Sequence, residues 1–298
     1  MFGSAAFGGV QRDYAILCGP DRNRGEAMKI VDAQVHIWSS GTPSGHHRQT
    51  SVFTAEELLR EMDAAGVHAA VIHPPSWDAN ANTMAIEAVR RHPSRFAILG
   101  QFPLDKPESR GLLEHWKDQP GMLGLRTALV LPHQQSWHED GTLDWLWPAA
   151  ERLGIPFATM AWRFLPAFAR IAERHPRLKL IIDHLGVVRT AQDDAAFETV
   201  PELVAIARKY PNVAMKATGA PSYSSGVYPF RNIHDHLHRL YDAFGSGRFF
   251  WGTDITRMPC SYRECVTMFS DELPWLSGRE LDLVMGQGVC DWLDWKPE

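Results

Sequence analysis

Two patterns of hydrophobic and polar positions alternate along the chain from Met28 onward. Short runs such as LKLIID and RFFWG are apolar at nearly every position, which is typical of a parallel strand covered on both faces. Each run is followed by a segment with apolar residues at helical spacing. The alternation continues for eight units without an obvious linker. It therefore predicts an α/β protein with a single-domain (β/α)₈ TIM barrel.

The strand and helix predictions follow directly from this pattern. The predicted strands are Ile30–Trp38, Ala69–His73, Ala97–Phe102, Gly124–Leu131, Ile155–Met160, Leu178–Asp183, Asn212–Lys216 and Phe249–Gly252. The predicted helices are Thr54–Ala65, Asn82–His92, Glu108–Lys117, Leu143–Leu153, Pro166–His175, Pro201–Tyr210, Ile233–Phe244, Tyr262–Phe269 and Arg279–Met285. Thr54 and Glu57 have the spacing of a capping box, and Gly66 supplies the stop of that first helix. No GxGxxG follows the first strand, which argues against a dinucleotide-binding fold.

Composition narrows the class of protein. The chain has 298 residues, 45% of them hydrophobic and 22% charged, as in an ordinary soluble protein with a full core. Its net charge of −5 and scattered Lys and Arg give no reason to expect nucleic acid. No apolar run approaches the roughly 20 residues of a membrane helix, and the four cysteines form no CxxC pair. We expect a cytoplasmic protein with a small-molecule substrate.

The roles of the first 27 residues and of three tryptophans near the C-terminal end have alternative interpretations. Residues 1–27 are rich in Gly, Arg and Asn and show no clear period, so we interpret them as an N-terminal extension or a misassigned start before a barrel domain over residues 28–298. Trp275, Trp292 and Trp295 either form a homo-oligomer interface or pack the last helices.

Polar residues at the C-terminal ends of strands are the default site of chemistry in a barrel. The first strand ends in Asp32, Gln34 and His36, which strict alternation places on one side as an inward-facing cluster. The alternative interpretation is a hydrogen-bonded strand terminus. His184 follows the fully apolar sixth strand, next to Asp183, which either orients it or faces outward.

Asp254 ends the eighth strand and has two interpretations. It can act as a general base toward water, or it can cap the segment that follows. Three convergent acid–base groups, His36, His184 and Asp254, are hard to explain by capping alone.

The sequence resembles a known family at these same residues. The motifs DAQVHIW, LIIDHLG and FFWGTD look like the amidohydrolase superfamily, most of all its branch of fuconolactonase-like and pyrone-dicarboxylate-lactonase-like enzymes. The resemblance covers about residues 28–292 and implies hydrolysis by an activated water. It implies that Asp254 takes the proton from water and passes it to the leaving group, and that His36 and His184 match two histidines of the family.

One departure concerns metal binding. The first histidine of the family's strand-one motif is Gln34 here, and an amide oxygen is a poor zinc ligand. The fifth-strand stretch PFATMAW contains no ligand either. On this ground we favour no tightly bound metal, with His36, His184 and the Gln34 amide as donors to the oxyanion. The alternative is one divalent metal, zinc or manganese, held by His36, His184 and Asp254.

Substrate contacts are predicted from positions near strand ends. Arg126 and Lys216 are candidates to clamp a substrate carboxylate, with a surface or interdomain ion pair as the alternative for Arg126. The adjacent His46 and His47 lie in a Ser/Gly/Pro-rich loop that we interpret as a flexible lid. Further candidate pocket residues, each with a packing role as the alternative, are His73, Trp77, His133, Trp162 and Tyr223.

These observations favour a hydrolase that opens a lactone or related cyclic ester of a small, carboxylated organic acid. One alternative is a metal-dependent amidohydrolase or non-oxidative decarboxylase of the same superfamily. Another is a barrel that binds a small ligand without catalysis. The loops after the strands decide among substrates, and their conformations do not follow from the sequence.

Overall fold

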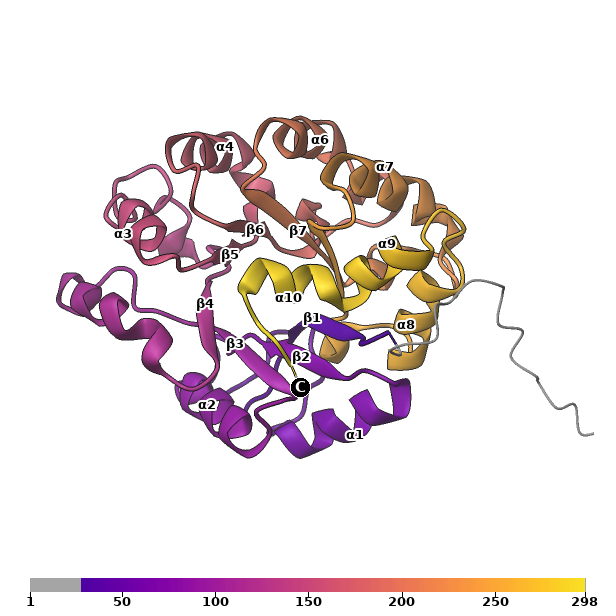
Figure 1. Cartoon of the computed structure of the whole chain (residues 1–298), viewed down its shortest axis with the longest axis horizontal. Helices are drawn as coiled ribbons and strands as arrows, with labels where there is room; N and C mark the ends of the chain where they lie inside the picture. The colour runs from indigo at the N-terminus through magenta and orange to yellow at the C-terminus, as the bar shows by residue number, and fades with distance from the viewer. Residues whose placement is uncertain (1–27, 298) are drawn as a thin grey trace, which may run out of the picture.

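The computed structural model describes residues 28–297, so the predictions for residues 1–27 lie outside the described residues. Eight parallel strands form one sheet in the order β1 to β8, with helices around it (Figure 1), which confirms the TIM barrel. The strands are β1 (Val31–Val35), β2 (Ala69–Ile72), β3 (Phe96–Gly100), β4 (Met122–Arg126), β5 (Phe157–Thr159), β6 (Leu180–Ile182), β7 (Val213–Thr218) and β8 (Phe249–Gly252).

The helices follow the predicted order with differences near the C-terminal end. They are α1 (Ala55–Ala65), α2 (Ala81–Arg91), α3 (Leu146–Leu153), α4 (Leu165–Arg174), α5 (Asp193–Ala196), α6 (Val200–Lys209), α7 (His234–Phe244), α8 (Tyr262–Ser270), α9 (Gly278–Asp282) and α10 (Gly288–Leu293). The predicted helix Glu108–Lys117 is a 3₁₀ helix, η1 (Pro107–Asp118). The predicted helix Arg279–Met285 is interrupted by a π turn, η8 (Leu283–Gln287), and the short helix α10 was not predicted.

Local sequence signals explain how the first helix begins and ends. The Thr54 hydroxyl accepts a hydrogen bond from the Glu57 amide at 3.1 Å, and the Glu57 carboxylate accepts one from the Thr54 amide at 2.7 Å. Gly66 ends α1 with φ of 78°, a left-handed conformation that costs glycine little. The capping box and the glycine stop predicted for this helix are therefore confirmed.

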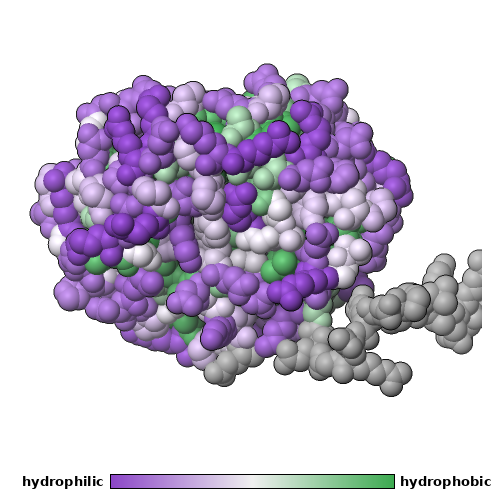
Figure 2. All heavy atoms as spheres, turned by 45° about the horizontal axis from the view of Figure 1, so that its top comes forward, coloured by the Kyte–Doolittle hydropathy of each residue, from purple (hydrophilic) through white to green (hydrophobic). Residues whose placement is uncertain are grey.

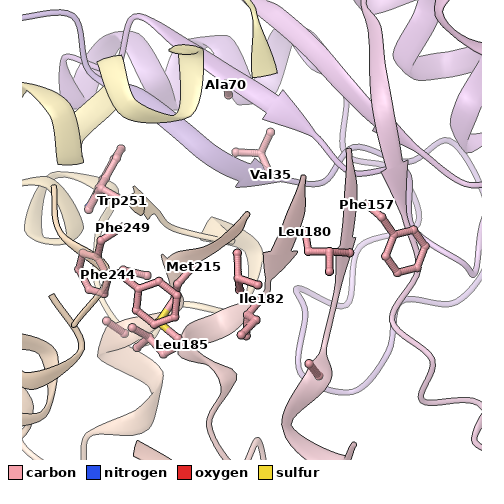
Figure 3. Packing of buried hydrophobic residues seen from close by; sticks show 14 of the residues in the cluster. Val35, Ala70, Phe157, Leu180, Ile182, Leu185, Met215, Phe244, Phe249 and Trp251 are labelled. Atoms are coloured by element: carbon pink, nitrogen blue, oxygen red, sulfur yellow. The ribbon is translucent and has the colours of Figure 1, made fainter. Parts of the chain in front are cut away.

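The core is divided into two layers by the strands. Alternate strand residues, among them Ile182, Met215 and Trp251, pack outward against the helices (Figure 3). The intervening ones, such as Ile181 and Ala214, fill the barrel interior. Residues of α10 belong to this interior cluster, and α10 lies across the ring of strands in Figure 1, so it closes the barrel at the end opposite the loops that carry the polar groups.

The surface carries small groups of apolar residues. In Figure 2 hydrophilic residues predominate, and the hydrophobic ones show in separate patches. The large hydrophobic side chains that are exposed in the described part of the chain are Val52, Leu112, Leu131 and Val227, far apart in sequence. No described helix combines the length and hydrophobicity needed to cross a bilayer.

A bulge in β1 corrects one prediction. Asp32 pairs with Ala70 and Val35 with Ile72, so β1 has one residue more than β2 between these pairs. The extra residue breaks strict alternation and turns Asp32 outward, whereas Gln34 remains inside. The prediction that Asp32 shares the inward cluster with Gln34 and His36 is wrong.

Asp32 instead joins the first and last strands. Its carboxylate accepts hydrogen bonds from the amides of Gln34 and Thr253, both at 2.9 Å, and from the hydroxyls of Thr253 at 2.5 Å and Tyr262 at 2.6 Å. The Asp254 amide adds a bond of 2.9 Å to the Gln34 carbonyl. Burial raises the pKa of Asp32 to about 6, against the lowering effect of these hydrogen bonds. This carboxylate therefore closes the barrel between β1 and β8 and places Asp254 beside the end of β1.

We expect Asp32→Ala to lower the free energy of unfolding by at least about 3 kcal/mol. The substitution leaves several buried donors without an acceptor, each at a cost of about 1–3 kcal/mol. Asp32→Asn should cost less, because its amide oxygen still accepts from both backbone amides. Urea denaturation of the two variants measures the difference. Equal losses in the two variants would contradict the role of this carboxylate in closing the barrel.

Candidate active site

Polar side chains replace apolar ones in the barrel interior toward the C-terminal ends of the strands. Along β7, Ala214 belongs to the apolar interior, whereas Lys216 and Thr218 bond to polar groups inside the barrel. On the neighbouring strands, too, a polar residue follows the last apolar residue that faces the barrel interior. We call the resulting set the inner polar layer; it consists of Gln34, His73, Arg126, Asp183 and Lys216.

A buried ion pair lies at the centre of the inner polar layer. The Lys216 ammonium is 2.7 Å from Asp183 Oδ1, and Arg126 Nε donates to Asp183 Oδ2 at 2.9 Å. Burial lowers the pKa of Lys216 to about 8, although the Asp183 charge opposes that shift. Arg126 thus makes a buried ion pair within the barrel, not the surface or interdomain pair of its alternative interpretation, and Asp183 holds both cations. The substrate-binding roles of Arg126 and Lys216 stay predictions.

Lys216 also orients Gln34 and, through it, His184. An ammonium only donates, so the atom of Gln34 at 2.7 Å from Lys216 Nζ is the amide oxygen. The Gln34 amide nitrogen then faces His184 Nε2 at 3.1 Å and donates to it. His184 therefore carries its proton on Nδ1, which donates to Thr218 Oγ1 at 2.8 Å. Both ring nitrogens of His184 are engaged, which leaves no lone pair on this ring for a metal ion.

His36 presents the opposite situation. Its Nδ1 lies 2.5 Å from the His73 carbonyl oxygen, which can only accept, so the proton is on Nδ1. The lone pair of Nε2 points toward Asp254, and His36 Nε2 is 3.3 Å from Asp254 Oδ1. The structure thus brings together the predicted residues His36, His184 and Asp254, whose Oδ2 is 3.8 Å from His184 Nε2. Of His36 and His184, therefore, only His36 offers a ring nitrogen to a ligand.

His47 is a member of the site that the sequence analysis missed. Its ring is buried, 3.8 Å from Asp254 Oδ1, and Nδ1 is 2.7 Å from Thr256 Oγ1. The Arg48 amide donates to the Thr256 carbonyl at 2.8 Å, which docks this loop onto the segment after β8. His46 is exposed, so the adjacent rings diverge, and the lid interpretation omitted the inward one. The sequence signal was a histidine in the loop after a strand that already ends in functional groups.

The backbone at the site is conformationally unusual. Asp254 has φ of 54° and His184 has φ of 54°, both in the left-handed region that non-glycine residues rarely adopt. Such conformations cost about 1–3 kcal/mol and concentrate at functional sites. Asp254 makes no capping hydrogen bond to the segment Ile255–Arg257, so the capping interpretation of this residue is wrong.

The buried groups have well-defined charges. Burial lowers the pKa of His36 and His184, and it lowers that of His47 to about 3, so these rings are neutral at pH 7. Burial acts to raise the pKa of Asp254, but its electrostatic interactions with His36, His47 and Arg257 outweigh burial and hold the pKa below its usual value. An ionised carboxylate therefore faces neutral imidazoles.

This donor set suits one divalent metal ion. One ligand atom each from His36, His47 and Asp254 lies within 4.8 Å of the others, and all three residues are buried. Asp254 Oδ1 has no hydrogen-bond partner among residues 28–297. Three protein ligands with neutral imidazoles and a carboxylate match catalytic zinc sites, which keep one position open. In this ligand set His47 takes the place of His184, which was the second histidine of the metal site considered from sequence.

The remaining predicted pocket residues divide into two groups. Tyr223 is buried and Trp77 half-buried, and the Trp77 ring centroid lies 6.0 Å from that of His36. Trp162 is half-buried in the loop after β5. His133 is exposed and packs against Trp137, with ring centroids 5.5 Å apart.

The fold and the site define a TIM-barrel protein with a candidate active site, and comparison with known proteins identifies its family. The amidohydrolase family model matches residues 31–277, and the chain belongs to this family. The L-fucono-1,5-lactonase of Burkholderia ambifaria is 23% identical over 75% of this chain and 79% of its own length. The 4-sulfomuconolactone hydrolase of Hydrogenophaga intermedia is 26% identical over 68% of each chain. The resemblance inferred from the three motifs is confirmed.

A solved structure supports the same fold. An amidohydrolase of Burkholderia multivorans with bound zinc has a TM-score of 0.77 at 18% identity, covering 90% of this chain and 100% of its own. Membership in a family of hydrolases identifies this protein as an enzyme, against the alternative of a non-catalytic barrel.

We expect Lys216→Met to lower the free energy of unfolding by about 3–5 kcal/mol, because it leaves the buried Asp183 carboxylate with one cation fewer. The double variant Lys216→Met/Asp183→Asn should be less damaging than Lys216→Met alone. Urea denaturation gives both values. Lys209→Met, which breaks an exposed pair with Glu173, is the matched control and should change little. A Lys216→Met protein as stable as this control would refute the importance of the buried pair.

Proposed function

We propose that the enzyme opens a lactone ring by attack of water on the ring carbonyl, with Asp254 as the base. The observation that carries the proposal is the Asp254 carboxylate, which is buried, ionised and without a hydrogen-bond partner for Oδ1 among the described residues. A carboxylate kept charged in a buried site without a full set of partners is costly in stability and therefore points to function. Both curated relatives are named for lactone hydrolysis, which supports this substrate class.

The proton transfers follow from the position of Asp254. Water adds to the carbonyl carbon as its proton passes to the carboxylate. The bond from that carbon to the ring oxygen then breaks, and Asp254 returns the proton to this oxygen, so that the product is a hydroxy acid. One carboxylate therefore serves as base and then as acid, which requires no other titrating group.

We also propose that His36, His47 and Asp254 hold one divalent cation, zinc by the chemistry of the ligands. When bound, the cation supplies the Lewis acidity that polarises the carbonyl and acidifies water. The N–H groups of His36 and His184 are committed to the His73 carbonyl and to Thr218 Oγ1, so neither is available to an oxyanion in this arrangement. This commitment favours a cation over the metal-free mechanism preferred from sequence.

Replacement of Asp254 by Asn should reduce kcat/KM for lactones about 10²–10⁴-fold, because an amide cannot take a proton from water. Far-ultraviolet circular dichroism should show an unchanged fold. Asp242→Asn on the exposed part of α7 is the control and should retain full activity. Full activity of the Asp254→Asn enzyme would eliminate this residue as the base.

Metal content tests the ligand set. We expect purified enzyme to contain about one equivalent of zinc by inductively coupled plasma mass spectrometry, and His47→Ala to lose most of it. His46→Ala is the matched control, since its ring is exposed, and should retain the metal. Less than about a tenth of an equivalent in the wild type, prepared without chelator, would restore the metal-free mechanism.

A further inference from the structure

Arg257 reaches the site from the segment after β8 with half of its guanidinium unpaired. Its side chain is only 5% exposed. Arg257 Nη2 donates to Ser222 Oγ at 2.7 Å, whereas Nη1 has no hydrogen-bond partner among residues 28–297. Asp254 Oδ2 is 3.7 Å from Nη1, which is beyond hydrogen-bond distance. A buried guanidinium normally has its five donors satisfied, so this one points to a missing acceptor.

A second arginine lies near the first. Arg189 follows the turn after β6, and its Nε is buried and without a partner in the described part of the chain. The pKa of Arg189 is lowered chiefly by burial and next by the Arg257 charge, so the two cations are close enough to repel. Two neighbouring cations, Arg257 with its side chain buried and Arg189 half-buried, are costly unless an anion lies between or beside them.

Two further donors in these loops are unpaired among the described residues. Tyr223 OH and Trp162 Nε1 are buried and unpartnered within residues 28–297. The Arg257 guanidinium carbon lies 5.3 Å from the centre of the Tyr223 ring, so Tyr223 borders the same space. The loops after β5, β6, β7 and β8 thus each contribute at least one donor. A ligand that satisfies them must carry oxygen acceptors and a negative charge.

Arg126 and Lys216, the cations predicted from sequence to bind a substrate carboxylate, have different surroundings. Arg126 and Lys216 both pair with Asp183, whose single carboxylate compensates part of their charge inside the protein. Arg189 and Arg257 have no such carboxylate at hydrogen-bond distance among the described residues.

We propose that Arg189 and Arg257 bind a carboxylate of the substrate and so select lactones that bear an acidic group. This inference rests on the proposed lactone hydrolysis for its reaction, and the two arginines name the substrate class. A guanidinium fork matches the two oxygens of a carboxylate, and Tyr223 OH can donate a further bond. Arg257 Nη1 lies beside Asp254, so the carboxylate and the reacting carbonyl are a few bonds apart in a small molecule.

Kinetics with matched substrates test the selectivity. The probes are a butenolide with a carboxymethyl group and its primary amide, which differ only in charge. We expect the wild type to prefer the carboxylate by at least about thirtyfold in kcat/KM, and Arg257→Met and Arg189→Met to lose most of this preference. Arg257→Lys should retain part of it, because the charge remains without the fork. Arg208→Met, exposed on α6, is the control and should change neither value.

Two kinetic outcomes overturn the proposal. If the wild type turns over both lactones equally, no carboxylate is recognised, although lactone hydrolysis itself stands. If the arginine variants lose both activities in parallel while remaining folded, the arginines serve only to keep Asp254 ionised.

Direct binding separates this proposal from the proposed function. Isothermal titration calorimetry with glutarate and with glutaramide does not depend on turnover. We expect glutarate to bind the wild type at least about tenfold more tightly than glutaramide, and Arg257→Met and Arg189→Met to abolish the difference. Glutarate binding without hydrolysis of any lactone would refute the proposed reaction and leave the carboxylate site intact. Equal affinities of the wild type for the two compounds would refute the site.

Discussion

The positive charge of Lys216 inside the barrel decides the arrangement of the groups around it. Its ammonium forms an ion pair with Asp183 and a hydrogen bond to the amide oxygen of Gln34, both at 2.7 Å. Because an ammonium cannot accept a hydrogen bond, the Gln34 amide has one orientation, and His184 has one tautomer. One cation thus determines the orientation of these donors and acceptors, and removal of its charge would release Gln34 and His184 and leave Asp183 with Arg126 alone.

This arrangement divides the polar interior into a paired part and an unpaired part. Within the inner polar layer each charged side chain has a partner of opposite charge, and Gln34 is hydrogen-bonded through both atoms of its amide. Toward the loops, Asp254 Oδ1, Arg257 Nη1 and Arg189 Nε have no partners among the described residues. The backbone at Asp254 is left-handed, which adds strain at the site. The loop that carries His47 docks beside it through the Arg48–Thr256 hydrogen bond. The paired layer positions the site, and the unpaired groups are the ones available for chemistry.

Local signals in the sequence were sufficient for the barrel and for part of the site. The strand order, the capping box at Thr54 and the convergence of His36, His184 and Asp254 follow from periodicity and from the geometry of strand ends. The outward turn of Asp32 could not be predicted in this way, because it depends on one extra residue in the pairing of β1 with β2. The ion pairs of Arg126 and Lys216 could not be predicted either, since their partner Asp183 follows another strand. The inward turn of His47 depends on how its loop docks onto Thr256, which no local pattern encodes.

The most direct test of the account is turnover of a carboxylated lactone in water enriched in ¹⁸O, followed by mass spectrometry of the product. Attack of water on the ring carbonyl predicts a hydroxy acid with one ¹⁸O atom in the newly formed carboxyl group. Failure of the enzyme to open any lactone, or release of carbon dioxide in place of the labelled hydroxy acid, would contradict lactone hydrolysis at Asp254 and favour decarboxylation.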